Sequence, residues 1–166
     1  MEVYKNLPEG TLAELIENVI YMSPSPVTNH QKVLQLIFRR LSEAIEDRGR
    51  GEVFVSAFDV YLDEFKNAVQ PDVLIIMNGN PGRLNPNGHF HGVPDFIVEV
   101  LSPGNKDYDL VKKKELYERF GVKEYWVVDP QTKQVQGFEL KNKTYQLLFE
   151  GTANIQSALL NLSFVF

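Results

Sequence analysis

The chain has 166 residues and a formal net charge of −5, which disfavours proteins that bind nucleic acid mainly by neutralising phosphates. It contains no cysteine, so disulfides, thiolate zinc sites and cysteine nucleophiles are excluded. The N-terminus does not resemble a signal peptide, and no apolar run approaches the ~18 residues of a membrane span. We therefore expect a single cytoplasmic domain over residues 1–166, with no membrane partner.

The first part of the chain predicts a hairpin followed by a helix. Residues 11–17 and 18–23 have the composition of two short strands joined by a tight turn, and the prolines of Ser23-Pro-Ser-Pro26 end the second strand. Thr28 and Gln31 have the spacing of a capping box, which predicts the start of a helix. The helix should then bury apolar residues that recur at helical spacing: Leu34, Ile37, Phe38, Leu41 and Ile45.

The middle of the chain predicts three strands. Residues 52–63 are rich in β-branched and aromatic side chains and are interpreted as one strand. Pro71-Asp72 opens a second strand over 73–77, and Pro94-Asp95 opens a third, very apolar strand over 96–101. Residues 78–93, rich in Asn, Gly and Pro, are expected to form the loop between them.

The last part predicts a second helix over about 106–120, ended by Gly121. A buried strand over 124–128 and two hairpin strands over 135–140 and 144–149 should follow, and the apolar tail over 155–166 should pack on the domain. Strands and helices are thus mixed. We expect an α/β (α+β mixed) fold with a mixed central sheet, and both long helices should pack against that sheet.

Glu99 interrupts the most apolar strand of the chain, Phe-Ile-Val-Glu-Val-Leu. A strand of this kind is usually covered on both faces, and an ionised carboxylate there is costly unless a cation or several donors meet it. One interpretation is a structural ion pair or a position at the rim of the sheet. The other pairs Glu99 with Asp72, because carboxylates on neighbouring strands can bind one hard cation. Alone, Asp72 could equally be a turn residue.

The second helix carries charged residues on its apolar face. At ~100° per residue, Asp109 and Lys113 fall within the face formed by Leu110, Leu116, Tyr117 and Phe120. One interpretation is a local pair between Asp109 and Lys113 at i, i+4 spacing. The other is a lysine directed at the carboxylates, where it could orient water or stabilise developing charge on a phosphate.

Glu14 is a further acid within an apolar strand, and His30 lies just inside the first helix. A lone histidine is more often a packed or capping residue than a ligand. His89 and His91 could suggest a metal, but their loop offers no other ligands, so we do not expect a site there.

Several motifs follow one another in an order that resembles a known family. The carriers are Ala13-Glu-Leu-Ile-Glu17, His30, Pro71-Asp72-Val, the run from Pro94 to Pro103, Asp109, Lys113, Tyr117, and the run from Gly121 to Pro130. This pattern resembles the bacterial Uma family of restriction-endonuclease-like proteins, within the PD-(D/E)XK nuclease superfamily. The resemblance covers about residues 10–150.

The resemblance implies a restriction-endonuclease-like core and a magnesium site, in which Mn²⁺ could substitute. Asp72 and Glu99 would stand for the two acidic metal ligands, and the backbone carbonyl of Val100 would complete the protein ligands. The superfamily lysine, two residues after the second acid, falls on Leu101 here. The family resemblance assigns that role to Lys113, with Glu14 as the early acidic residue and Asp109, His30 and Tyr117 in support.

Three hypotheses follow from the sequence. The first is a metal-dependent endonuclease that hydrolyses DNA phosphodiester bonds, with a homodimer plausible because cutting both strands usually needs two active sites. The second is a non-catalytic nucleic-acid-binding or protein-binding module, in which Asp72, Glu99 and Lys113 form a structural ion cluster. The third is hydrolysis of another phosphate ester.

Overall fold

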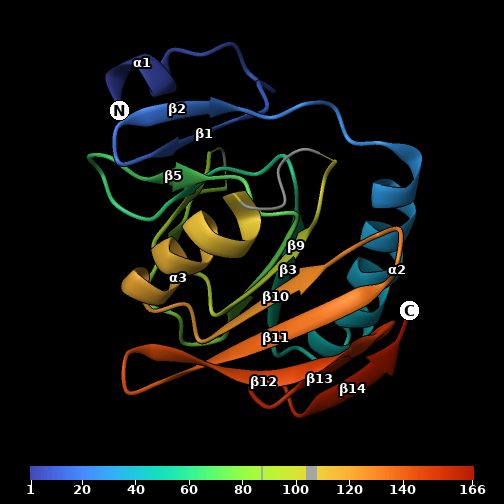
Figure 1. Ribbon diagram of the computed structural model, residues 1–166. Coiled ribbons are helices and arrows are strands. Elements are labelled where there is room, and N and C mark those ends of the chain that lie inside the picture. Colours follow the sequence, from blue (N-terminus) through green and yellow to red (C-terminus); the bar gives the residue numbers. More distant parts are fainter. Residues whose placement is uncertain (87, 104–107) are drawn as a thin grey trace.

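The computed structural model describes residues 1–86, 88–103 and 108–166 (Figure 1). Its centre is a six-stranded sheet in which β9 and β10 are parallel and all other neighbours are antiparallel. The predicted mixed sheet is therefore confirmed. From one edge to the other, its strands are β12 (Thr144–Thr152), β11 (Gln134–Lys141), β10 (Glu124–Val128), β9 (Phe96–Val100), β6 (Val73–Met77) and β3 (Gly51–Val55).

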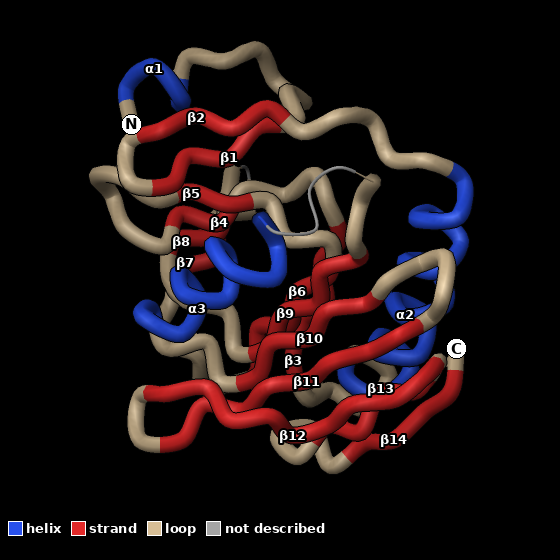
Figure 2. The backbone as a smooth tube through the Cα atoms, in the orientation of Figure 1, coloured by secondary structure: helices blue, strands red, loops and turns tan. Residues whose placement is uncertain are grey.

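The two faces of the central sheet pack against different partners (Figure 2). One face is covered by α2 (Thr28–Ile45) and by the C-terminal hairpin of β13 (Asn154–Ser157) and β14 (Leu162–Val165). The other is covered by α3 (Lys114–Phe120). Both helices pack on the sheet as expected, and the tail packs on the domain as expected, although as strands.

The alternation of side chains along β9 decides where Glu99 lies. Phe96, Val98 and Val100 join the apolar cluster on the α2 side, whereas Ile97 joins the cluster on the α3 side. Successive side chains of a strand point to opposite faces of the sheet. Glu99 therefore belongs to the α3 face, where it is 2 % exposed.

The helix α2 begins at Thr28 as predicted, but the capping box is wrong. Val27 is the N-cap residue, and no side chain caps the helix start. Thr28 is already within the helix, so its hydroxyl is not in the position from which a cap residue bonds the first free N–H groups. The apolar stripe is confirmed: Leu34, Ile37, Leu41 and Ile45 are buried, and Phe38 packs against them half-buried.

A second six-stranded sheet, which the sequence did not predict, lies over the α3 side and next to the short helix α1 (Glu2–Lys5) (Figure 2). Its edge hairpin is the predicted one, and its turn residues Glu17 and Asn18 have φ of 51° and 64°. Two positive φ values are typical of the two-residue hairpin turn that matches strand twist. In order, the strands are β2 (Val19–Met22), β1 (Ala13–Ile16), β5 (Ala68–Val69), β4 (Val60–Tyr61), β8 (Phe90–His91) and β7 (Arg83–Leu84).

Two predictions fail at this second sheet. The single strand over 52–63 is two strands, because β3 pairs with β6 of the central sheet whereas β4 pairs with β5 and β8 of the second sheet. The expected loop over 78–93 contains β7 and β8. Strand-forming composition reports local preference but not the pairing partner, and two-residue strands are too short to give a periodic signal.

The second helix is described from residue 108 onward. It begins as a wide π-helical segment, η1 (Tyr108–Lys113), and continues as α3 to Phe120. Gly121 follows with φ of 90°, a left-handed conformation that glycine adopts without strain, so the predicted stop is confirmed. Short π-helical segments often occur at functional sites. Here the segment ends at Lys113.

No helix in the described ranges is both long and apolar enough to cross a bilayer.

Candidate metal-dependent active site

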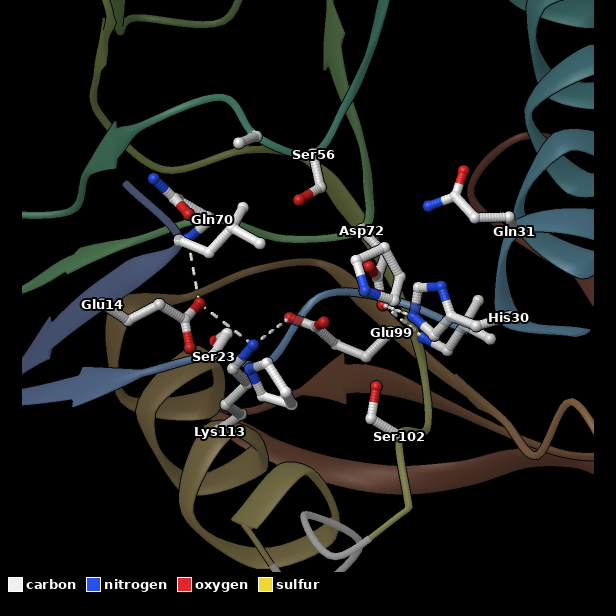
Figure 3. Close-up of a pocket in the computed structure, with 15 residues that line it drawn as sticks. Glu14, Ser23, His30, Gln31, Ser56, Gln70, Asp72, Glu99, Ser102 and Lys113 are labelled. Atoms are coloured by element: carbon white, nitrogen blue, oxygen red, sulfur yellow. Dashed lines mark hydrogen bonds and ion pairs between the residues drawn. The ribbon is translucent and has the colours of Figure 1, made fainter. Parts of the chain in front are cut away.

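A cavity of about 140 Å³ lies where β1, the start of α2, β9 and η1 come together (Figure 3). It brings together residues from widely separated parts of the chain, from Leu12 to Lys113. Six residues that the sequence singled out line it: Glu14, His30, Asp72, Glu99, Val100 and Lys113.

Lys113 is the cation of this cavity and is 5 % exposed. Its Nζ lies 3.0 Å from Oε1 of Glu99 and 3.0 Å from Oε1 of Glu14. Both carboxylates are also buried, so the ammonium is held between two acids from different sheets. A buried charge is tolerable when it is paired and hydrogen-bonded. Lys113 is therefore buried, as its place on the apolar face of the helix predicted.

Tyr117 orients the buried carboxylate of Glu99. Its hydroxyl donates a hydrogen bond of 2.7 Å to Oε1 of Glu99. Burial raises the pKa of Tyr117 well above its ordinary value, and the negative charge of Glu99 raises it further. Tyr117 therefore keeps its proton at neutral pH and remains a donor to Glu99.

Asp72 occupies the other end of the cavity, beside His30 (Figure 3). Its Oδ2 accepts a hydrogen bond of 2.8 Å from the backbone N–H of Val100 and lies 3.2 Å from Nε2 of His30. No described residue donates a hydrogen bond to Oδ1 of Asp72. The carboxylate is thus oriented through one oxygen, which leaves the other as a ligand atom.

Gln70 is a site residue that the sequence did not single out. Its backbone N–H donates a hydrogen bond of 2.9 Å to Oε1 of Glu14, and its side chain also lines the cavity. The one available signal was its position directly before Pro71-Asp72. Further polar side chains at the cavity were also missed because nothing local distinguishes them: Ser23, Gln31, Ser56 and Ser102.

The donor set suits a hard cation. Asp72 and Glu99 offer carboxylate oxygens, which Mg²⁺ prefers, and Mg²⁺ commonly takes only one or two carboxylates from the protein. Within the described ranges, no group of three or more His, Cys, Asp or Glu side chains lies in an arrangement that could hold a metal ion. A cation here would therefore complete its shell with backbone oxygen, water or substrate.

His89 and His91, in the Gly-His-Phe-His-Gly stretch, lie outside this cavity, and each contacts a different acidic side chain. Nδ1 of His91 is 2.5 Å from Glu64, and Nδ1 of His89 is 3.6 Å from Asp59.

A family model described as "Uma2: Putative restriction endonuclease" matches residues 1–164. The chain belongs to the Uma2 family. The resemblance stated from the sequence motifs is thereby confirmed over a longer range than the motifs covered.

A solved structure with a similar fold is the crystal structure of a "putative nuclease belonging to DUF820" from Anabaena variabilis ATCC 29413. It is 18 % identical to this Uma2 chain, with a TM-score of 0.79, and the match covers 99 % of this chain and 93 % of the other. At this identity the likeness shows the fold. A search of the curated proteins found no match.

The sequence resemblance placed the nuclease lysine of its superfamily at position 101, where this Uma2 chain has a leucine. Leu101 stands there and is 6 % exposed within the apolar cluster on the α3 side. Lys113 from η1 instead reaches Glu99. Val100 lines the cavity, and its backbone N–H donates the hydrogen bond to Asp72. The side chain of Asp109 lies outside the described part of the structure, so its expected pairing with Lys113 stays a prediction.

Proposed function

We propose that this chain is a metal-dependent endonuclease that hydrolyses DNA phosphodiester bonds. Asp72 and Glu99 would hold Mg²⁺, with Mn²⁺ able to substitute, and the carbonyl of Val100 is the proposed further ligand. One observation carries the proposal: a buried lysine, Lys113, is held between two buried acids in the same cavity as Asp72. Family membership supports a nuclease function in general.

When bound, Mg²⁺ would polarise the scissile phosphate and lower the pKa of a coordinated water. The protein supplies orientation and charge. Lys113 presents an ammonium to the charge that develops on the phosphate oxygens, and Glu14 and Glu99 fix its position. Tyr117 fixes Glu99, and His30 with the N–H of Val100 fixes Asp72. Asp109 is proposed to support Lys113 from the same helix.

The direct test is cleavage of supercoiled and linear DNA with Mg²⁺, Mn²⁺ or EDTA. We expect cleavage with either metal, none with EDTA, and a loss of about a thousandfold in Glu99→Gln. The matched control is Glu124→Gln. Glu124 is a buried glutamate on the adjacent strand that accepts hydrogen bonds from Trp126 and Ser157 and does not line the cavity. Full activity of Glu99→Gln would remove Glu99 from the mechanism.

Double-strand cleavage needs two active sites, so a homodimer, or a higher oligomer, belongs to this proposal. Sedimentation with and without a DNA duplex measures it. A monomer that nicks one strand at a time would restrict the proposal to single-strand cleavage.

A second candidate is a non-catalytic module that binds nucleic acid or protein. Its support is that Lys113 pairs with Glu99 and Glu14, so these three side chains could serve the fold alone. Asp72 lies outside this ion cluster and leaves one oxygen without a described donor, which favours the nuclease. DNA binding without cleavage under every metal tested would favour the module.

A further inference from the structure

A second cavity, of about 590 Å³, lies next to the metal-site cavity. Ala57 and Gln70 line both cavities, so the two are neighbours along the same wall. Ligand cavities for small organic molecules are typically ~300–1,000 Å³. The metal-site cavity is smaller than this range, whereas the second cavity is large enough for a planar ring system.

Four side chains with aromatic rings line the second cavity: Tyr4, Phe58, Tyr61 and His89. Tyr61 is in contact with His89 at a ring-centroid distance of 5.6 Å and with Tyr4 at 6.3 Å, edge to face. Phe58 also lines the cavity and is stacked on Phe54 at 4.6 Å. Aromatic side chains are the surfaces on which unpaired nucleobases stack.

Asp59 supplies an oriented acceptor in this cavity. Its Oδ1 accepts hydrogen bonds from the hydroxyl of Tyr4 at 2.9 Å and from Nε2 of Gln70 at 2.7 Å. No described residue donates a hydrogen bond to Oδ2, although Nδ1 of His89 lies 3.6 Å away. The side chain is 18 % exposed, so Oδ2 can meet a ligand donor.

The charge of the cavity favours a neutral ligand over a phosphate. Asp59 and Glu9 line it together with a single lysine, Lys5. A phosphate would be repelled by the two acids, and an ionised carboxylate accepts hydrogen bonds but donates none. The cavity therefore matches a ring with N–H donors on its edge.

We propose that the second cavity binds an unstacked nucleobase, preferentially guanine, of the nucleotide whose phosphate occupies the metal-site cavity. Gln70 connects the two places, since its N–H donates to Glu14 and its side chain donates to Asp59. Guanine carries a ring N–H and an amino group side by side, so both donors can approach Oδ2, the oxygen of Asp59 that accepts no hydrogen bond from the described residues. Thymine flanks its one N–H with two carbonyl oxygens, which a carboxylate repels. This inference rests on the proposed nuclease function, because it names that site's substrate as an unpaired or extruded nucleotide.

The test measures binding of the nucleosides deoxyguanosine and thymidine by calorimetry or NMR titration, in EDTA, so that neither a phosphate nor a metal contributes. We expect deoxyguanosine to bind about tenfold more tightly than thymidine, and Asp59→Asn to abolish that preference. His89→Ala should weaken deoxyguanosine binding about tenfold, since a stacking face is lost. His91→Ala is the matched control. His91 stacks on the same Tyr61 ring, at 4.7 Å, but does not line the cavity.

Equal affinity for deoxyguanosine and thymidine in the wild-type protein would overturn the inference, as would deoxyguanosine binding that His89→Ala leaves unchanged. If Asp59→Asn fails to fold, His89→Ala still decides, because its side chain is 47 % exposed and supports little of the core. Guanine-selective binding in a protein that cleaves no DNA would support the base subsite and contradict the nuclease. Cleavage of DNA without guanine-selective binding would support the nuclease and contradict the base subsite.

Discussion

Two Pro-Asp steps open neighbouring strands of the central sheet, and they behave differently. Asp95 is 3 % exposed, and both of its carboxylate oxygens are bonded. Oδ1 lies 2.7 Å from Nζ of Lys123, while Oδ2 accepts hydrogen bonds from the N–H of Met77 and from Asn80. Asp72 has 15 % side-chain exposure, lines the cavity that also holds Lys113, and receives both its contacts on Oδ2.

The Pro-Asp motif alone therefore does not decide the role of its aspartate. Pro-Asp before an apolar strand is compatible with an acid that fixes a loop and with an acid that binds a ligand. What differs is how many donors the rest of the fold directs at the carboxylate. A fully bonded carboxylate contributes to stability, and a partly bonded carboxylate at a cavity can take part in binding.

The largest effect is expected at Lys113. Lys113→Met leaves Glu14 and Glu99 buried without their shared cation, and removing one partner of a buried ion pair typically costs ~3–5 kcal/mol. Cleavage should fall by about a hundredfold or more. Urea unfolding and DNA cleavage measure the two losses. Adding Glu14→Gln to Lys113→Met should recover part of the stability but none of the activity; recovery of cleavage would contradict the role of Lys113.

The sequence predicted the central parts of this site because they leave a local signal. Glu99 stands out by interrupting an apolar strand, and Lys113 by falling on the apolar face of a helix. Both signals depend on spacing within one element, which the fold preserves.

The rest could not be predicted because it depends on contacts between distant segments. The second sheet brings Glu14 to Lys113 and Gln70 to Glu14, and neither β4 nor β8 is long enough to show periodicity. The different roles of Asp72 and Asp95 are set by Val100, His30, Asn80 and Lys123, and no spacing in the sequence reveals those partners.

The next prediction compares the loss in free energy of unfolding caused by Asp95→Asn with the loss caused by Asp72→Asn. Asp95→Asn removes the negative charge that three donors contact and leaves one accepting oxygen for them, so we expect a loss of ~1–3 kcal/mol, because hydrogen bonds to charged groups are stronger than neutral ones. Asp72→Asn should cost less than ~1 kcal/mol, because the amide oxygen can still accept from Val100. Equal losses in the two variants would contradict the distinction drawn between them.

Tyr117→Phe should have an intermediate effect. It removes the hydroxyl that donates to Glu99, and hydrogen bonds to charged groups contribute ~1.5–3 kcal/mol. The raised pKa of Tyr117 also makes stability depend on pH. Because the folded pKa lies above the unfolded value of about 10, stability is present below pH 10 and falls above it, by ~1.4 kcal/mol per pH unit for each such group. Thermal unfolding from pH 8 to 11 should show a shallower fall in the variant than in wild type, and identical slopes would contradict this.

The smallest effect is expected at the partner of Asp95. Lys123→Met removes a lysine whose side chain is 60 % exposed, so the pair is largely screened by solvent and should contribute less than ~1 kcal/mol. Cleavage should not change. Measured beside Lys113→Met, it compares two lysines that both contact acids of the central sheet, and equal destabilisation would show that burial is not the deciding factor.

The most direct test of the central claim is calorimetric titration of Mn²⁺ into the wild-type protein, Asp72→Asn and Asp95→Asn, without DNA. We expect binding at one or two sites in the wild type, retention in folded Asp95→Asn, and loss in Asp72→Asn. Binding that Asp72→Asn leaves unchanged, or no binding in the wild type, would contradict a metal site built on Asp72 and Glu99.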